Sequence, residues 1–208
     1  RAGMYDGERI RGNMLPDVLT TQLRDEAAGV PVGQRVLRIA THHAARSRGL
    51  GSRLLAEIRA EFADAVDWLG VGYGATPELV DFWADNGYRT VHLSTTRNDE
   101  SGEYSVLMLD PTIAAGRDLF DRHASQFAAR VGEVLADPLD DLDPGVVGAT
   151  LTALDRERDP GLADWEWRHV ASAAFGPGLF DAAPGAYRRL VVAALASDAD
   201  IHLSERER

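Results

Sequence analysis

The chain has 208 residues, of which 45% are hydrophobic and 26% charged, a composition that supports one core of ordinary size with an appended helical part. It contains no cysteine, which excludes disulfides, thiolate metal sites and cysteine nucleophiles. No stretch approaches the ~20 apolar residues of a membrane-spanning helix, and the first residues do not resemble a signal peptide. We therefore expect a soluble, cytoplasmic protein, and we interpret the start at Arg1 as that of a fragment.

The charge composition is unusual, because 33 acidic residues face 22 basic ones and every basic residue is arginine. The resulting net charge of -11 concerns solubility and non-specific binding rather than fold. An aspartate-rich chain without lysine is typical of a GC-rich genome and a salt-loaded cytoplasm, where charge repulsion is screened over a few ångströms. The sequence therefore predicts a halophilic source. The net charge alone argues against nucleic acid as a partner, but RNA binding depends on local arginines.

Up to residue 110, helical and strand patterns alternate between glycine and proline breaks. From Leu50 to Phe62 an apolar residue recurs every four positions, as on the core face of an amphipathic helix. The continuous apolar character of Arg35–Thr41 predicts a central strand, and the whole order predicts an α/β layer fold. The expected elements are helix Pro16–Asp25, strand Arg35–Thr41, helix Gly51–Val66, strand Trp68–Tyr73, a helix from Pro77 capped by Thr76 and ended by Asn86-Gly87, and strands Tyr88–Leu93 and Glu103–Leu109.

After Pro111 the pattern is alanine-rich and mostly helical, so we expect a boundary there, with one domain over residues 1–111 and a helical region over 112–208. The acidic stretch Asp137–Asp143 is typical of a solvated loop. The predicted helices cover Ala114–Leu135, Val146–Arg156, Trp165–Phe175 and Tyr187–Ala196.

The segment Arg46–Ser52, which reads RSRGLGS, follows the first predicted strand and opens the strongest helix. Two glycines let the backbone approach a ligand, and the free N–H groups of a first helical turn suit a diphosphate. Arg46 and Arg48 add charge-assisted contacts. The alternative is an ordinary glycine turn with exposed arginines. A lysine-containing phosphate loop is excluded, and the glycines of Gly70–Gly74 are spaced wrongly for a dinucleotide fingerprint, so they indicate close packing of the strand or a ligand passing over it.

Arg46-x-x-Gly49-x-Gly51 at a strand-to-helix junction resembles the acyl-coenzyme A signature of GCN5-related N-acetyltransferases, the GNAT fold. Further segments resemble the tRNA(Met) cytidine acetyltransferase family over roughly residues 10 to 111, and the helical tail does so weakly. The segments that carry this resemblance are Gly12–Asp17, Arg38–Ala40, Gly49–Ser52, Gly74–Leu79, Phe82-Trp83 with Asn86–Tyr88, and Ser101–Ser105.

The resemblance implies a partial GNAT acetyltransferase sheet with flanking helices, followed by a truncated tRNA-binding helical region. Members of the family use ATP and acetyl-CoA to form N4-acetylcytidine in RNA. The resemblance also implies that an N-terminal ATPase module and the first strands of the acetyltransferase sheet are missing from this chain, so we expect ATP use to belong to the parent protein. The implied partner is tRNA or another RNA, with no membrane and no metal.

The resemblance also implies a cofactor site by position. Ile39, Ala40 and Thr41 would follow the pantetheine arm with their backbone groups. Glu78 would lie near the far end of the cofactor. The diphosphate would be wrapped by Arg46, Ser47, Arg48, Gly49, Leu50, Gly51 and Ser52.

Two departures from the family pattern concern catalysis. His43 stands where many GNAT proteins have proline, and Trp83 stands where many have the tyrosine that protonates the departing thiolate. An indole N–H is not acidic enough for that role, so the catalytic residues stay unassigned and Trp83 is interpreted as a packing residue. Each candidate base is more often a packed or solvent-facing side chain than a catalyst; the candidates are His42, His43, Tyr73, Tyr88, His92 and Tyr104.

The remaining aromatic and imidazole groups have structural alternatives. The six histidines show no metal-ligand spacing. Trp165 and Trp167 are candidates to stack on unpaired bases, although core packing is favoured for at least one of them. Two other functions stay open: a GNAT enzyme that acetylates a small-molecule or protein amine, and a non-catalytic RNA-binding fragment.

Overall fold

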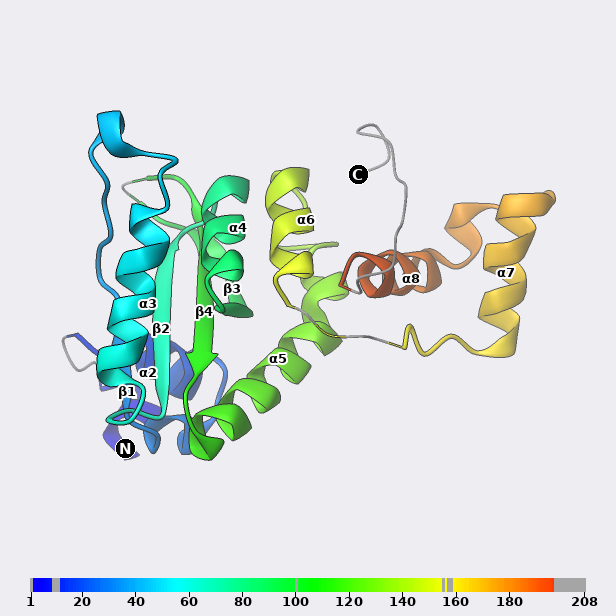
Figure 1. Ribbon diagram of the computed structural model, residues 1–208. Coiled ribbons are helices and arrows are strands. Elements are labelled where there is room, and N and C mark those ends of the chain that lie inside the picture. Colours follow the sequence, from blue (N-terminus) through cyan, green and yellow to red (C-terminus); the bar gives the residue numbers. More distant parts are fainter. Residues whose placement is uncertain (1, 9–11, 100, 155, 157–158, 197–208) are drawn as a thin grey trace.

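The computed structural model describes residues 2–8, 12–99, 101–154, 156 and 159–196. Four strands form one mixed sheet in the order β1-β2-β4-β3, and helices surround it (Figure 1). The predicted α/β class is therefore confirmed. The strands are β1 (Gly33–Arg35), β2 (Trp68–Gly74), β3 (Arg89–Arg97) and β4 (Tyr104–Pro111).

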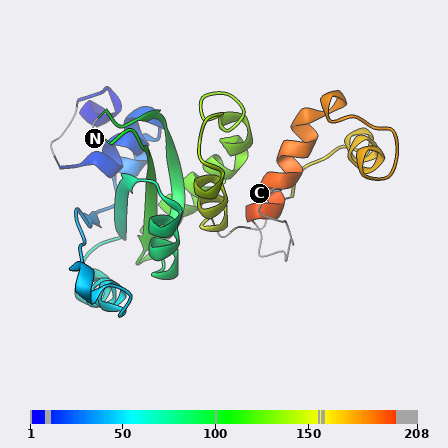
Figure 2. The same ribbon diagram turned by 90° about the horizontal axis from the view of Figure 1, so that it is seen from above.

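Helices cover both faces of the sheet (Figure 2). On one side lie α3 (Leu50–Phe62) and α4 (Pro77–Asp85). The N-terminal helical segment and α5 (Ala114–Val134) lie on the other side. This segment comprises α1 (Ala2–Tyr5), α2 (Met14–Asp17), a π-helical turn (Val18–Gln22) and a 3-10 turn (Glu26–Gly29), where the sequence predicted one helix over Pro16–Asp25.

The glycines of β2 allow close packing on the N-terminal side of the sheet. A Cβ on Gly70 would lie 2.9 Å from Leu15 Cδ1, and one on Gly72 would meet Met14 Cε. At both positions a Cβ would lie too close to a side chain of α2, so β2 carries glycine where α2 crosses it. The predicted packing role of these residues is confirmed.

Local signals at α4 are confirmed. Thr76 is the N-cap, and its Oγ1 accepts from the Leu79 N–H at 3.4 Å. Pro77 occupies the first turn, where its missing N–H costs no hydrogen bond. Asn86 is the C-cap, and Gly87 follows with φ of 93°, a left-handed conformation that glycine adopts without strain.

The predicted central strand Arg35–Thr41 is wrong in both extent and position. The strand is Gly33–Arg35, and it lies at the edge of the sheet beside β2. Pairing ends at Arg35 opposite Gly70, and Leu37 is 70% exposed. The apolar run does not mark a strand buried on both faces, because the chain leaves the sheet after Val36.

The predicted core face of α3 is only partly correct. Leu55 is the buried residue of this helix among those described, whereas Leu50 and Leu54 are 45% and 49% exposed. Ile58 and Phe62 are partly buried against the core. The spacing of the apolar residues does predict the helix. Within the described part of the chain, however, other elements cover only some of these apolar side chains.

The tail divides into a packed part and an exposed part. Helices α5, α6 (Pro144–Thr152) and α8 (Pro184–Ala196) contribute side chains to the same core as the sheet. Helix α7 (Asp164–Phe175) has no buried residue and lies at the far end of the molecule from the sheet (Figure 1). A domain boundary at residue 111 stays a prediction.

Two interpretations of the tail need correction. Trp165 and Trp167 are 52% and 45% exposed, so neither packs in a core as expected. The stretch Asp137–Asp143 is not simply solvated, because Leu139 within it is 2% exposed. Asp141 accepts from the Tyr104 hydroxyl at 2.7 Å, and Asp143 caps α6.

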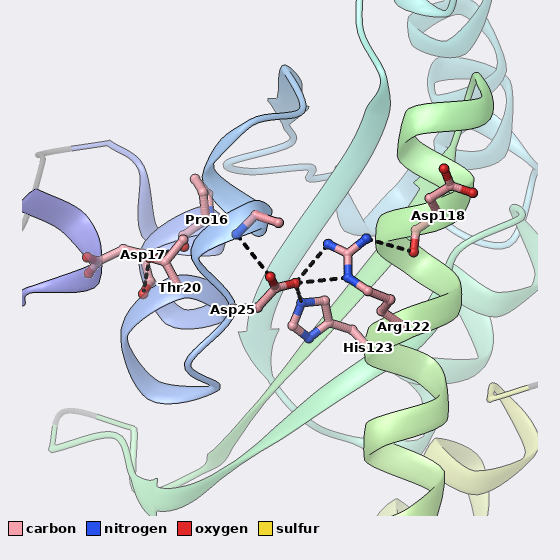
Figure 3. Close-up of polar contacts among 8 residues, drawn as sticks. Pro16, Asp17, Thr20, Asp25, Asp118, Arg122 and His123 are labelled. Atoms are coloured by element: carbon pink, nitrogen blue, oxygen red, sulfur yellow. Dashed lines mark hydrogen bonds and ion pairs between the residues drawn. The ribbon is translucent and has the colours of Figure 1, made fainter. Parts of the chain in front are cut away.

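A partly buried polar network joins the N-terminal segment to α5 (Figure 3). Asp25 Oδ2 lies 3.0 Å from His123 Nε2 and 2.8 Å from Arg122 Nη2. Burial favours a raised pKa of Asp25, but the hydrogen bonds and charges of Arg122 and His123 outweigh it and lower that pKa below its ordinary value. An ionised Asp25 accepts from the Nε2–H of His123, whose side chain is fully buried.

Screening by salt should stabilise this chain. With a net charge of -11, repulsion among acidic side chains opposes the compact state. Added ions screen this repulsion, so that it acts over a shorter distance. We expect the melting temperature to rise from dilute buffer to molar potassium chloride. A melting temperature that stays constant or falls would contradict the halophilic interpretation; sulfate is not a valid substitute, because it stabilises most proteins.

Candidate functional site

The strands β1 and β2 run parallel and then separate. Their last backbone hydrogen bond runs from the Val36 N–H to the Gly70 carbonyl at 2.9 Å. Strand β2 continues to Gly74 and pairs with β4 along its whole length, but its other edge has no strand partner beyond Gly70 among the described residues. The residues after Val36 and the end of β2 therefore lie on the two sides of an unpaired stretch between the strands, which we call the slot.

At the far end of this slot the chain turns into α3. Residues His43–Ala45 form a 3-10 turn, and α3 begins with Gly49 as its N-cap. Among the described residues no side chain caps the helix, so the N–H groups of its first turn keep no acceptor within this part of the chain. The partial positive charge of a 13-residue helix adds to these donors. This end of α3 has the chemistry of an anion site.

The loop conformation explains its glycines. Gly49 has φ of 72°, and Ser47 also lies in the left-handed region with φ of 56°. A Cβ on Gly51 would lie 3.1 Å from the Phe82 ring of α4, so glycine lets α3 begin close to α4. The glycine spacing therefore serves both the turn and the packing of two helices around the slot.

The predicted cofactor residues surround the slot and the helix start. Ile39 is partly buried against the core, Ala40 is exposed and Thr41 is half-buried. Glu78 is exposed in the first turn of α4, one turn before Phe82. The diphosphate candidates Arg46, Ser47, Arg48, Gly49 and Leu50 are exposed, while Gly51 and Ser52 are half-buried. Their roles as ligands stay predictions.

Two candidate bases lie beside the loop. His42 and His43 are both exposed, and their rings are 4.2 Å apart. His42 Nδ1 accepts from the Ala44 N–H at 3.3 Å, so it caps the 3-10 turn and has only Nε2 available. This capped turn, which includes His43, leads into the loop.

Tyr73 is the candidate base on β2 beyond Gly70, where the edge of the strand that faces β1 has no strand partner among the described residues. Its ring stacks on Trp83 at 5.9 Å, and its hydroxyl donates to the Leu79 carbonyl at 3.3 Å. Burial first, and then the charge of Asp81, raise the pKa of Tyr73 above its ordinary value. A phenol with a raised pKa stays protonated at neutral pH, so Tyr73 can donate a hydrogen bond but is a poor base.

The other three candidates lie in packed surroundings. Tyr88 is 1% exposed against Trp83, and its hydroxyl has no hydrogen-bond partner among the described residues. His92 is 4% exposed, and its Nδ1 accepts from Arg130 Nη2 at 2.6 Å. Tyr104 is 7% exposed and bonds Asp141. No catalytic assignment follows for any of them.

The sequence analysis missed Arg35, which lies where β1 and β2 part. Its Nη2 donates to the Gly72 carbonyl at 3.3 Å, across the line of separation. The signal available in the sequence was a charged residue inside an apolar strand pattern. Within the described ranges, no group of three or more histidine, aspartate or glutamate side chains has the arrangement of a metal site.

Comparison with known proteins identifies the family of the chain. The profile of GNAT acetyltransferase 2 matches residues 1–63 and 53–112, which is more than half of the chain. The chain belongs to the GNAT acetyltransferase 2 family. The expected GNAT fold is thereby confirmed.

The relatives of this GNAT chain carry one name. It is 65% identical over 207 residues to the tRNA(Met) cytidine acetyltransferase TmcA of Haloferax volcanii and 64% identical over 208 residues to that of Haloarcula marismortui. In both cases all of the chain aligns, but it spans only 28% and 27% of the relative. The TmcA of Pyrococcus furiosus is 38% identical over 144 residues. The predicted family resemblance is confirmed, and the first two sources fit a halophile.

Proposed function

We propose that this GNAT chain transfers an acetyl group from acetyl-CoA to the N4 amine of a cytidine in RNA, with tRNA(Met) as the substrate class. The observation that carries the proposal is the uncapped start of α3, beside Arg46 and Arg48, at the end of a slot between separated strands. An uncapped helix start binds a diphosphate, and the open edge of a strand can pair with the amides of an extended arm. The names of the relatives support cytidine as the acceptor.

The chemistry needs positioning more than covalent help. The N4 lone pair attacks the thioester carbonyl, so a C–N bond forms and the C–S bond breaks when the tetrahedral intermediate collapses. The acetyl group stays on nitrogen, coenzyme A leaves as thiolate, and the proton lost from N4 passes to solvent or to the thiolate. Backbone N–H groups of the unpaired segment that follows Val36 are suited to stabilise the developing oxyanion.

We also propose where ATP is used, what the helical tail contacts and where the protein acts. Because the chain spans about a quarter of the length of its curated relatives, we assign ATP use to a part of the protein outside residues 1–208. Exposed Trp165 and Trp167 on α7 support stacking on unpaired bases by the helical tail, residues 112–208. None of the described helices is both long and apolar enough to cross a membrane. We propose a cytoplasmic location, where an enzyme of tRNA acts.

Mass spectrometry of nucleosides tests this function directly. The full-length protein is incubated with acetyl-CoA, ATP and tRNA(Met), and the RNA is digested to nucleosides. We expect N4-acetylcytidine at one position, and none when acetyl-CoA is omitted. Acetylation of a small-molecule or protein amine without any acetylcytidine would overturn the proposal in favour of another GNAT acceptor. Coenzyme A binding without turnover would favour a non-catalytic role.

Crowding the start of α3 should weaken cofactor binding. Gly51→Val places a branched side chain against the Phe82 ring, only 3.1 Å from the position of its Cβ, and forces the first helical turn to move. We expect acetyl-CoA affinity to fall at least tenfold, about 1.4 kcal/mol, by calorimetry. Gly148→Val in α6 is the matched control, because its Cβ meets nothing within 4 Å. Unchanged affinity in a folded Gly51→Val protein would rule out this loop as the diphosphate site.

A further inference from the structure

Arg35 occupies the junction at which the slot opens. It is the last paired residue of β1, and the next residue makes the final backbone bond to β2. Its guanidinium reaches beyond that bond to the Gly72 carbonyl. The register pairs Arg35 with Gly70, whose Cβ position faces Leu15 of α2. The Arg35 side chain therefore lies on the sheet face that α2 covers. The diphosphate candidates are at the start of α3, on the opposite face.

The hydrogen bonds of Arg35 are incomplete. Its Nε is buried without a partner in the described part of the chain, and its Nη2 donates to the Gly72 carbonyl. Burial lowers the pKa of this guanidinium, because the charged group loses part of its hydration in the fold. Other arginines of the chain, by contrast, form ion pairs with carboxylates: Arg59, Arg97, Arg122, Arg156 and Arg189.

A polar trough of about 380 Å³ runs beside this guanidinium. Its polar lining comes from Gln34, Arg35 and Asn13, and apolar side chains such as Leu37 and Trp68 complete it. The Asn13 side chain is exposed and makes no cap to α2, so its amide is available to a ligand. The volume is within the ~300–1,000 Å³ typical of small-molecule sites.

The trough adjoins the segment that the proposed cofactor arm would follow, because Leu37 lines it. A cofactor arm that starts at the α3 N-terminus and follows Thr41 back to Leu37 spans about 16 Å of extended backbone. Its acyl end then reaches the residues next to Arg35. A nucleophile in the trough approaches from the opposite face of the sheet, so cofactor and acceptor meet through the slot without competing for the same surface.

We propose that this trough binds the acceptor base and that Arg35 selects cytosine by donating to its N3 and O2 atoms. This inference rests on the proposed function for the identity of the acceptor. A guanidinium has donors only, arranged as a planar fork that matches two adjacent acceptors. Cytosine carries N3 and O2 in that arrangement beside its N4 amine. Adenine has a C–H in place of O2, and guanine has an N–H beside its amine, so each lacks one acceptor.

The experiment measures base binding without requiring turnover. Cytidine monophosphate, its 3-deaza analogue and adenosine monophosphate are titrated into the full-length protein in the presence of coenzyme A, and binding is followed by NMR. The 3-deaza analogue replaces the N3 acceptor with C–H. A bidentate contact contributes ~1–3 kcal/mol of discrimination, so we expect cytidine monophosphate to bind at least fivefold more tightly than either of the other two.

Two variants connect the preference to Arg35. Arg35→Lys keeps the charge and removes the fork, so the preference for cytidine over 3-deazacytidine should fall to near one while acetyl-CoA affinity stays within twofold. Arg117→Lys, an exposed matched control on α5, should keep the preference. Thermal melts establish that both variants fold.

The outcomes separate this inference from the function. Equal binding of the three nucleotides by the wild-type protein, no binding at millimolar concentration, or a folded Arg35→Lys protein that keeps the preference would each overturn the role of Arg35. Absence of acetylcytidine in the turnover assay would overturn the proposed function instead, and a cytidine preference that depends on Arg35 would still stand.

Discussion

Replacing Trp83 with alanine should lower the free energy of unfolding by about 3–5 kcal/mol, the usual cost of the cavity left by a buried tryptophan. The indole is 3% exposed and lies at the centre of an aromatic cluster. Tyr88 meets it edge-on at 4.8 Å, Phe82 edge-on at 5.6 Å, and Tyr73 stacks on it at 5.9 Å. Losing this ring removes contacts that hold α4 against β2, beside the slot.

The matched substitutions separate packing from catalysis. Trp83→Phe should keep most of the stability and of the single-turnover acetylation rate, because a smaller ring retains part of the cluster. Trp165→Ala on α7 should change the free energy of unfolding little, since that indole is 52% exposed. The measurements are urea melts and rapid-quench acetylation by the full-length protein. A Trp83→Phe protein that melts normally but reacts a hundredfold more slowly would show that the indole N–H takes part in catalysis.

Acid should destabilise this protein through His92, and the effect should begin at a pH where most carboxylates are still ionised. Burial, followed by the charges of Arg130 and His123, lowers the pKa of His92 to about 3. Arg130 can only donate, so His92 Nδ1 is the acceptor and the ring is neutral in the folded state. The unfolded chain takes up a proton near the ordinary value of ~6.5.

The direction of the effect follows from these two pKa values. Between pH 6.5 and about 3 the unfolded state binds the proton and the folded state does not, so stability falls as pH falls. The slope is about 1.4 kcal/mol per pH unit, and the full window amounts to roughly 4–5 kcal/mol. Burial also lowers the pKa of His123, which adds to the effect in the same direction.

Urea melts at several pH values isolate this contribution. His92→Asn keeps an acceptor for Arg130 but does not titrate, so its stability should decline less steeply than that of the wild type between pH 6 and 4. The exposed His43→Asn variant is the control and should follow the wild type. Parallel pH profiles for the wild type and His92→Asn would show that His92 does not govern the acid sensitivity.

The sequence by itself determined the elements whose signals are local. Thr76-Pro77 and Asn86-Gly87 marked both ends of α4, and the glycines near residue 50 marked the start of α3. These signals involve residues within one turn of each other, where backbone geometry and capping need no distant partner. The segments that resemble the acetyltransferase family were also visible in the sequence alone, and the family is confirmed.

Only the tertiary structure decided how those elements meet. The apolar run Arg35–Thr41 indicated a central strand, but the end of its pairing with Gly70 turned most of it into one wall of a slot. The same apolar spacing predicted a buried face on α3, yet burial depends on what covers the helix. Arg35 carried no motif, because its hydrogen bond goes to Gly72, a residue 37 positions away that only folding brings within reach.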